Sequence, residues 1–228
     1  MQKRRRVNQQ CKKRSLLTVC SLCSIIATVN VIRLTIFGGS FNPPHVGHLL
    51  LGEEVVTQLG YDTLLFVPVW KNPFKAEPSG ATEVDRVEML KRAIAAVGNN
   101  HLDIELCEIK RRNISYTADT VACLAQKYAG RLDGKIGLVI GDDLSCDFHK
   151  WHKYRELLAL SEVIVARRVL EPTEGAFPFP YTELQNALLP ISSSDIRRRI
   201  ASGGAWRALV VPSVAEYIMQ KKLYGYTP

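Results

Sequence analysis

The stretch that decides the fold covers residues 34–48, which read LTIFGGSFNPPHVGH. Four β-prone residues lead into Gly38 and Gly39, and a loop with two prolines then leads into the start of a helix. Paired glycines allow a tight turn and let the backbone come close to a ligand. We therefore expect a buried strand, a ligand-binding glycine turn and a helix N-terminus in direct succession.

Two histidines stand at this helix start. His45 and His48 are three residues apart, so they share one face of the helix, and a helix N-terminus favours anions. We expect Gly47 to leave a gap between the imidazoles that a phosphate or a flat ring can enter. The spacing is neither a dinucleotide-binding GxGxxG nor a P-loop, since residues 130–135 are one residue too short for the latter. The pair therefore predicts phosphate chemistry of another kind.

Apolar runs typical of strands buried on both faces alternate with helical patterns along the rest of the chain. Strands are expected at 34–37, 63–67, 102–106, 136–140 and 162–166, and helices at 46–59, 83–97, 118–128, 151–160, 193–201 and 213–223. This alternation predicts an α/β fold of one domain: a Rossmann-like open parallel sheet with helices on both faces, followed by C-terminal helices. Ligands are expected at the carboxyl ends of the strands.

The formal net charge of +8 is unevenly distributed. Residues 1–32 hold seven of the 30 basic residues and no acidic one, whereas residues 33–228 hold 23 basic and 22 acidic residues. We expect residues 1–32 to be a basic and apolar leader outside the fold and residues 33–228 to form the domain. The near-neutral domain argues against a nucleic-acid partner.

Three interpretations of the leader stay open. It is a start assigned upstream of the true one, a loosely docked extension, or a targeting or anchoring segment, and we favour the first. Its apolar part, residues 16–32, is short for a membrane span and runs directly into the first strand, so we expect no stable membrane association.

The cysteines predict no disulfide framework. Three of the six lie in the leader, and Cys107, Cys123 and Cys146 are scattered through the domain, which suits a reducing compartment and a cytoplasmic protein. The pairs Cys20-x-x-Cys23 and His149-x-x-His152 lack further ligands, so no metal site is expected.

Motifs spread over residues 33–225 resemble the nicotinate-nucleotide adenylyltransferases, which are members of the H-x-G-H nucleotidyltransferases. Residues 38–48 resemble the phosphate-binding signature of that superfamily, and residues 191–197, ISSSDIR, resemble its I-S-S-T-x-I-R motif. Residues 115–120, SYTADT, together with Trp151, are what selects the family. Asn42 stands where the family frequently has an aspartate, and Ser194 stands where its motif has a threonine. We expect neither difference to change the function that the resemblance implies.

The resemblance implies adenylyl transfer from ATP to nicotinate mononucleotide, giving nicotinate adenine dinucleotide and pyrophosphate, in NAD biosynthesis. It implies ATP and nicotinate mononucleotide as partners and Mg²⁺ that arrives with ATP as cofactor. A homo-oligomer is left open, as is the use of nicotinamide mononucleotide.

The resemblance also implies roles for individual residues. The catalytic group is His45, His48 and Arg197. The groups that bind ATP and its phosphates are Gly38, Gly39, Ser40, Phe41, Gly47, Lys75, Gly141, Asp142, Ser193 and Ser194. The mononucleotide is held by Tyr116 and Thr117 at a helix start and by Trp151, which stacks on the nicotinate ring. Lys75 either assists the leaving pyrophosphate or is a loop charge, and we expect Asp143 to cap a helix and Arg198 and Arg199 to face solvent.

Two other classes of protein remain as alternatives. A sister nucleotidyltransferase, such as phosphopantetheine adenylyltransferase, shares the histidine loop but is not expected to carry residues 115–120 with Trp151. A non-catalytic or membrane-tethered nucleotide-binding module is disfavoured, because every expected phosphate-binding group is present.

Overall fold

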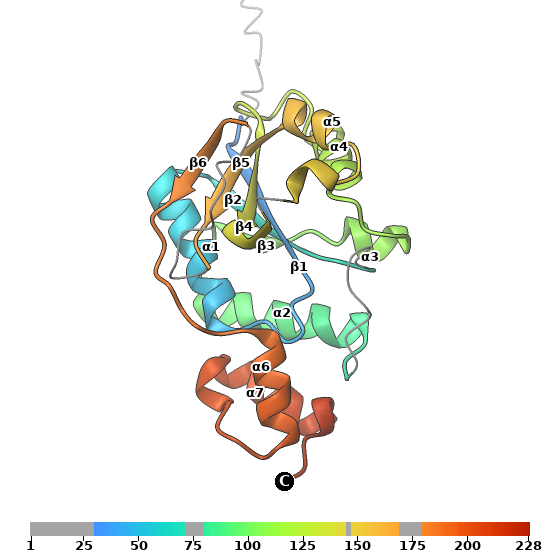
Figure 1. Cartoon of the computed structure of the whole chain (residues 1–228), viewed down its shortest axis with the longest axis vertical. Helices are drawn as coiled ribbons and strands as arrows, with labels where there is room; N and C mark the ends of the chain where they lie inside the picture. Colours follow the sequence, from blue (N-terminus) through green and yellow to red (C-terminus); the bar gives the residue numbers. More distant parts are fainter. Residues whose placement is uncertain (1–29, 72–79, 145–146, 169–178) are drawn as a thin grey trace, which may run out of the picture.

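The computed structural model describes residues 30–71, 80–144, 147–168 and 179–228. Six parallel strands form one sheet in the order β3-β2-β1-β4-β5-β6 (Figure 1). They are β1 (Leu34–Gly39), β2 (Thr63–Pro68), β3 (Leu102–Ile104), β4 (Ile136–Gly141), β5 (Ser161–Ala166) and β6 (Tyr181–Leu184). The strand order reverses between β1 and β4, and open parallel sheets bind ligands beyond such a switch point.

Helices connect the strands and follow the last one. They are α1 (Val46–Leu59), α2 (Glu83–Val97), α3 (Cys107–Arg111), α4 (Thr117–Lys127), α5 (Tyr154–Leu160), α6 (Ser193–Ala201) and α7 (Pro212–Lys221). The predicted α/β fold with its parallel sheet is confirmed, and the bounds of α1, α2 and α6 are as predicted. The helix expected from residue 151 begins only at Tyr154, because Lys153 before it adopts a left-handed φ of 51°.

Two short elements were not expected from the sequence. The helix α3 has five residues, of which Glu108 is the buried one, and it follows a strand that ends at Ile104, two residues earlier than predicted. The strand β6 has three exposed residues at the edge of the sheet, so it carries no buried apolar run that would mark it as a strand.

Alternate residues of the strands face two different cores. On β2, Leu65 and Val67 pack with residues of α4 and α5, whereas Leu64 and Phe66 pack with residues of α1 and α2. Figure 1 shows α4 and α5 on the opposite side of the sheet from α1. Because both faces are covered, the strands read as continuous apolar runs rather than as alternating ones.

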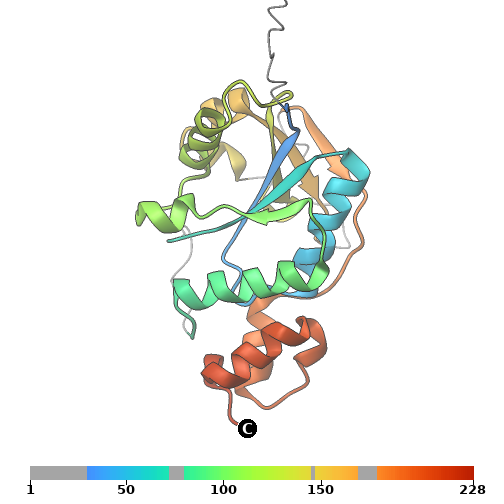
Figure 2. The ribbon, with the colours of Figure 1, turned by 180° about the vertical axis from the view of Figure 1, so that it is seen from behind.

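A third core joins the C-terminal helices to α2. Met89 of α2, Ile196 of α6 and Ile218 of α7 are buried in one cluster. Figure 2 shows α6 and α7 packed below α2, at one end of the molecule. This packing brings α6, near the end of the chain, to the loop between β1 and α1, near its beginning.

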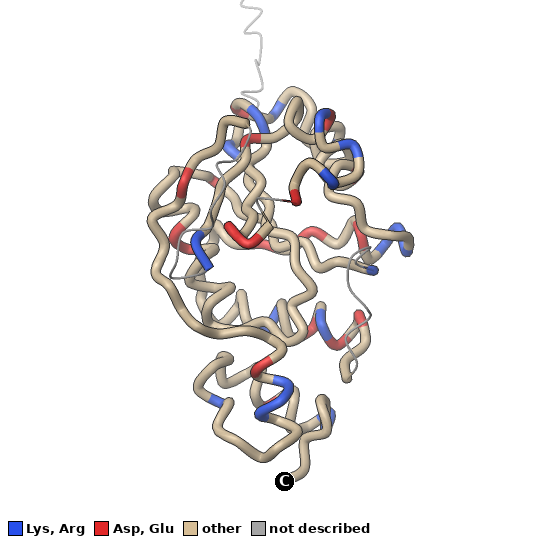
Figure 3. The backbone as a smooth tube through the Cα atoms, in the orientation of Figure 1, with Lys and Arg blue, Asp and Glu red and all other residues tan. Residues whose placement is uncertain are grey.

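The described chain attaches to the fold slightly earlier than expected. Ile32, placed in the leader by the sequence, pairs with Leu132, and its N–H donates to the Arg131 carbonyl at 2.7 Å. Residues 1–29 lie outside the described residues. Acidic and basic residues are interspersed along the described chain (Figure 3). Within that part of the protein, no helix is long and apolar enough to cross a membrane.

Candidate active site

The loop between β1 and α1 reverses the chain at Phe41. Gly38 and Gly39 remain part of β1, so the glycine turn expected there is wrong, and Phe41 instead adopts a left-handed φ of 47°. Such a conformation costs on the order of 1 kcal/mol or more for a residue with a Cβ, and burial of the ring against Phe37 and Phe66 offsets this cost. A Cβ on Gly39 would lie 2.9 Å from the Phe41 ring, so glycine is needed at position 39.

The two histidine rings lie directly on one another. Their centroids are 3.6 Å apart at an interplanar angle of 23°, so the gap expected between the imidazoles does not exist. A Cβ at Gly47 would lie 3.2 Å from Nδ1 of His45. Gly47 thus makes room for the ring of His45, and a ligand can meet the edges of this pair but cannot enter between the rings.

Both imidazoles are neutral near pH 7. Burial, followed by the nearby Arg168, lowers the pKa of His45 to about 4. Burial, His45 and Arg168 together hold the pKa of His48 well below its usual value. The backbone N–H of His45 donates to Nδ1 of His48 at 3.2 Å, so the proton of the neutral His48 ring resides on Nε2. His48 can therefore donate a hydrogen bond from Nε2.

Nδ1 of His45 is a buried polar atom without a hydrogen-bond partner among the described residues. Buried polar atoms are nearly always paired in folded proteins. This nitrogen can donate to a phosphate oxygen only in the tautomer that places the ring proton on it. The Nε2 proton of His48 is therefore the donor that the structure defines at this position.

A buried arginine holds the beginning of the loop. Arg86 of α2 donates from Nη1 to the Ser40 carbonyl at 2.8 Å and from Nη2 to the Val69 carbonyl at 2.7 Å. The guanidinium thus links the loop after β1 to the loop after β2. The sequence analysis gave Arg86 no role, although a lone arginine on the apolar face of a predicted helix was a usable signal.

The helix α6 holds the rest of the loop. Arg197 donates from Nη1 to the Asn42 carbonyl at 2.7 Å and from Nη2 to the Ser194 hydroxyl at 3.1 Å. The Ser193 hydroxyl, expected to face a phosphate, donates instead to the Pro43 carbonyl at 2.8 Å. A pocket of about 420 Å³ lies on the C-terminal side of α6, and no residue of the β1–α1 loop lines it. Its lining residues are Gly80, Ser194, Arg197, Arg198, Ala201, Tyr224 and Gly225.

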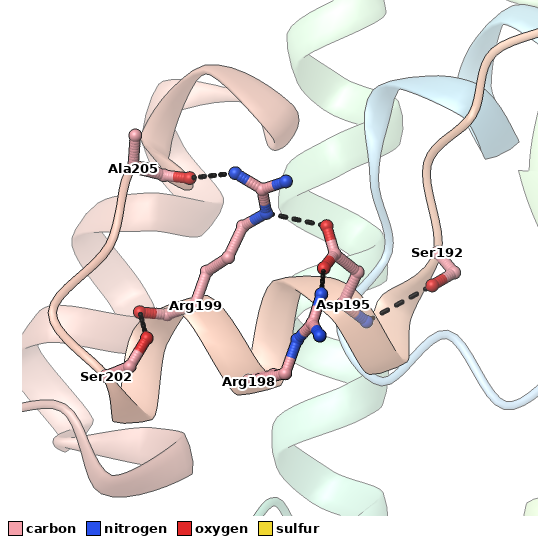
Figure 4. Close-up of polar contacts among 6 residues, drawn as sticks. All are labelled: Ser192, Asp195, Arg198, Arg199, Ser202 and Ala205. Atoms are coloured by element: carbon pink, nitrogen blue, oxygen red, sulfur yellow. Dashed lines mark hydrogen bonds and ion pairs between the residues drawn. The ribbon is translucent and has the colours of Figure 1, made fainter.

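The other two arginines of α6 face away from the loop. Arg198 and Arg199 both bind the Asp195 carboxylate, as Figure 4 shows, and Arg199 also donates to the Ala205 carbonyl at 3.2 Å. The backbone N–H of Asp195 in turn donates to the hydroxyl of the N-cap residue Ser192 at 3.1 Å. Arg198 and Arg199 lie on the exposed helix face, as expected, and Arg197 alone of the three reaches the loop.

The end of β4 faces an unexpected arginine. Arg168, two residues beyond β5, donates from Nη1 to Asp143 at 2.9 Å, and its backbone N–H donates to Asp142 at 2.9 Å. The expected helix-capping role of Asp143 is thus replaced by an ion pair. A Cβ on Gly141 would lie 2.5 Å from Cδ of Arg168, so glycine is needed for the arginine to cross the strand end. The pair of arginines directly after the fifth expected strand was the signal for this residue.

A second group of expected residues gathers at the start of α4. Tyr116 is the N-cap residue of α4, and its own side chain makes no capping hydrogen bond. The His152 ring lies 4.3 Å from the Tyr116 ring, which brings the segment of Trp151 beside α4. Trp151 is half-buried and stacks on Phe148 at 4.9 Å, so its inner face packs on the core. Lys75 lies outside the described residues.

The described residues hold no group of three or more His, Cys, Asp or Glu side chains that could bind a metal ion. Arg86 and Arg197 contact the loop directly, and Arg168 acts electrostatically on His45. Asp142 and Asp143 at the end of β4 bind Arg168. Guanidinium groups bind phosphates in two-point contacts, so this site is suited to a polyphosphate.

Comparison with known proteins places the chain among nucleotidyltransferases. Residues 36–199 match the Cytidylyltransferase-like family. A probable nicotinate-nucleotide adenylyltransferase of Treponema pallidum is 39% identical over 204 residues, which cover 85% of this chain and 99% of the relative. A probable enzyme of the same name from Borreliella burgdorferi is 34% identical and is covered to 97%.

Solved structures share the fold at lower identity. Nicotinic acid mononucleotide adenylyltransferase of Plasmodium falciparum complexed with NaAD has a TM-score of 0.65 at 18% identity, with 86% of this chain and 98% of that chain covered. A putative nicotinate-nucleotide adenylyltransferase of Vibrio parahaemolyticus has a TM-score of 0.62 at 21% identity, with the same coverage. These likenesses extend over almost the whole of each solved chain.

Proposed function

The chain belongs to the cytidylyltransferase-like family and, within it, to the nicotinate-nucleotide adenylyltransferases, and from this membership we propose that it transfers the adenylyl group of ATP to nicotinate mononucleotide. The products are nicotinate adenine dinucleotide and pyrophosphate, in NAD biosynthesis. One observation carries the chemistry: the neutral, stacked pair of His45 and His48 at the N-terminus of α1, where the strand order reverses.

The reaction needs no general base. A phosphate oxygen of the mononucleotide is anionic at neutral pH and attacks the α-phosphorus of ATP. A new P–O bond forms as the bond to the bridging oxygen of pyrophosphate breaks, and pyrophosphate leaves with the electron pair. The enzyme has to align two polyanions and stabilise the charge on the transferred phosphoryl group. His48 donates from Nε2 to an oxygen of that group, and His45 orients the triphosphate beside it.

The negative charge of the two substrates is neutralised by arginines of the protein and by the metal ion that accompanies ATP. Neutral imidazoles add no charge, so Arg197 and Arg168 supply the cationic groups on the protein side. Mg²⁺ enters with ATP and supplies most of the charge neutralisation on the triphosphate. Backbone and hydroxyl donors for the phosphates come from Gly38, Gly39, Ser40 and Ser194. The side chain of Lys75 is assigned to this group from the sequence alone.

The remaining expected residues divide between adenosine and nicotinate. Phe41, Gly141 and Asp142 shape the strand ends where the adenosine lies. The uncapped backbone of Tyr116 and Thr117 at the start of α4 receives the nicotinate carboxylate, because a helix N-terminus favours an anion. The exposed face of Trp151 stacks on the nicotinate ring.

We also propose where the catalytic unit begins and acts. Residues 33–228 form it, with Ile32 paired to its edge. Cys107 and Cys123 are free thiols, which supports a reducing, cytoplasmic setting.

The experiment that tests the proposal measures pyrophosphate release from ATP and Mg²⁺ in four parallel arms. Three arms contain nicotinate mononucleotide, nicotinamide mononucleotide or phosphopantetheine, and the fourth is a control without acceptor. We expect the highest kcat/KM with nicotinate mononucleotide. Preference for phosphopantetheine would identify a sister transferase instead, and ATP binding without release in any arm would leave a nucleotide-binding module.

A further inference from the structure

A buried carboxylate lies beneath the acceptor end of the site. Glu108 of α3 is only 4% exposed, and no role in binding or chemistry has been assigned to it. Burial of a carboxylate is unfavourable unless its hydrogen bonds are replaced by the protein. The groups that bond Glu108 therefore indicate which part of the structure the buried carboxylate stabilises.

The hydrogen bond of Glu108 leads to one end of a short segment, residues 115–120. The Thr120 hydroxyl donates to Oε1 of Glu108 at 2.6 Å, and Arg111 donates to the same hydroxyl at 3.2 Å. Burial raises the pKa of Glu108, and Thr120, Ser115 and Arg111 act against this shift. Oε2 of Glu108 has no hydrogen-bond partner among the described residues, so Thr120 is the residue that the carboxylate holds. Thr120 lies in the first turn of α4, and Ser115 is the residue before its N-cap.

Ser115, at the other end of this segment, is fixed separately. Its N–H donates to the Lys71 carbonyl at 2.9 Å, and its hydroxyl accepts from the Trp70 N–H at 3.0 Å. Ser115 is therefore anchored to the segment that follows β2, and Thr120 is anchored to α3 through Glu108. Between these anchors lie Tyr116 and Thr117.

The start of α4 has no side-chain cap of its own. The N-cap residue Tyr116 offers none, whereas Thr82 caps α2 and Ser192 caps α6 through their hydroxyls. A helix start that lacks a cap is normally less well ordered, because its backbone donors stay unpaired. Here the orientation of those donors is set by the groups that hold the two flanking residues. Ser115 is held by the backbone of residues 70 and 71, and Thr120 is held by Glu108.

We propose that Glu108 is the positioning residue of the acceptor end: by holding Thr120, while residues 70 and 71 hold Ser115, it fixes the backbone donors of Tyr116 and Thr117 that receive the nicotinate carboxylate. The inference rests on the proposed function, which assigns this turn to nicotinate mononucleotide. Glu108 touches no substrate, so its effect falls on binding of the acceptor and on the choice of nicotinate over nicotinamide. ATP, which binds at the β1–α1 loop, is unaffected.

The chain offers a matched control for this residue. Glu105 is another buried glutamate, 6% exposed and three residues away, but its carboxylate accepts from Lys127 at 2.5 Å, at the far end of α4. Substitution of Glu105 removes a buried carboxylate of similar exposure without touching the anchors of the turn. A general loss of stability in this region thus appears in both variants, whereas a positioning effect appears only in the Glu108 variants.

The test compares Glu108→Gln, Glu108→Ala and Glu105→Gln in the full chain, with KM and kcat measured for both substrates. We expect Glu108→Ala to raise the KM for nicotinate mononucleotide about tenfold, the effect of losing one buried hydrogen bond to a charged group. The KM for ATP and the kcat at saturating acceptor stay within about twofold. Glu108→Gln keeps an acceptor for Thr120, so it recovers most of the affinity, and Glu105→Gln leaves both KM values unchanged.

A second variant covers the case in which Glu108→Ala does not fold. Thr120→Val keeps the shape of the side chain and removes the hydroxyl, and we expect it to raise the same KM. Combined with Glu108→Gln, it adds little to the larger single effect, because the two groups act through one hydrogen bond. The preference for nicotinate over nicotinamide mononucleotide falls in parallel.

The results separate the two proposals. An equal rise of both KM values, an unchanged acceptor KM, or the same change in Glu105→Gln overturns the positioning role while the activity of the wild-type protein stands. Absence of turnover with nicotinate mononucleotide in the wild-type protein overturns the proposed function, and the positioning role with it.

Discussion

The β1–α1 loop and the turn at the start of α4 are both assigned to anionic groups, yet they are held in different ways. The loop is fixed by Arg197 and Tyr224, which bind Asn42 from 155 and 182 residues farther along the chain. The turn is fixed at one end by Glu108, whose partner Thr120 is 12 residues away. The geometry of the phosphate end therefore depends on the last residues of the chain, whereas that of the acceptor end depends on contacts of residues 115–120 with Glu108 and with residues 70 and 71.

This difference predicts two classes of variant. A change at the phosphate end affects catalysis with any acceptor, because every adenylyl transfer uses the same triphosphate geometry. A change at the acceptor end alters the KM of one substrate and leaves the chemistry intact. The following experiments test this division, beginning with the largest expected effect.

His48→Ala gives the largest effect. We expect kcat/KM to fall about 10²–10³-fold, or roughly 3–4 kcal/mol, because the variant loses the Nε2 donor to the transferred phosphoryl group. Steady-state kinetics with nicotinate and nicotinamide mononucleotide should show the same loss with both. His101→Ala is the control, since the His101 ring bonds only the Asp62 carbonyl in the described structure. Near-normal turnover of His48→Ala would contradict its assignment and remove the distinction between the two ends.

The buried histidines also predict a pH dependence of stability. An unfolded chain protonates His45 below about pH 6.5, whereas the folded protein does so only near pH 4. Between these values the unfolded state binds more protons, so the free energy of unfolding decreases as the pH falls through this range, by about 3 kcal/mol for His45 alone.

Urea denaturation at pH 7 and pH 4 measures this dependence. His45→Asn removes the titrating group, so the variant should lose about 3 kcal/mol less on acidification than the wild-type protein does. The carboxylates titrate alike in both proteins and cancel in the difference. Identical losses in the two proteins would show that His45 is not held neutral by the fold.

Trp151→Ala tests the acceptor end. Loss of stacking on the nicotinate ring is worth about 1–2 kcal/mol, so we expect the KM for the mononucleotide to rise about tenfold while the KM for ATP stays unchanged. Trp151→Phe keeps a stacking face and should recover much of the affinity. Equal increases of both KM values would instead favour a packing role, which the contact of Trp151 with Phe148 makes a serious alternative.

The sequence predicted the elements that carry a regular hydrophobic pattern. The strand and helix periodicities predicted five of the six strands and the bounds of α1, α2 and α6, since burial on both faces of the sheet imposes them. The edge strand β6 and the short helix α3 carry no such period, so they were missed. The location of the site at the carboxyl end of β1 followed from glycine and histidine chemistry that is local in sequence.

The internal geometry of the site did not follow from the sequence. Whether Gly47 separates the imidazoles or allows them to stack depends on the path of the backbone at Phe41, which no pattern reports. The roles of Arg86, Arg168 and Glu108 arise from contacts across 46, 25 and 12 residues, and a single sequence does not reveal such pairs. Long-range polar contacts are thus where prediction from the sequence failed, and they are densest at the phosphate end.

Tyr224→Phe tests whether that long-range scaffold serves catalysis. The Tyr224 hydroxyl is buried and donates to Oδ1 of Asn42 at 2.5 Å, and Asn42 also presents its carbonyl to Arg197. Removal of one neutral hydrogen bond costs about 1 kcal/mol, so we expect kcat to fall about fivefold with either acceptor, although the hydroxyl lies on the last turn of the chain. Because Asn42 acts here through a side-chain oxygen, the aspartate frequent at this position would accept the same bond.

Tyr226→Phe is the matched control for this prediction. The Tyr226 hydroxyl accepts from Arg207 at 3.3 Å, within the C-terminal helices, so its loss affects their packing without reaching the loop. If both variants reduce kcat to the same extent, the C-terminal helices support the fold only in a general way. If Tyr224→Phe alone reduces kcat, the hydroxyl sets the position of Asn42 and, through it, of Arg197. The phosphate end is then assembled only when the last helical turn has docked, whereas the residues assigned to the acceptor end all precede α6.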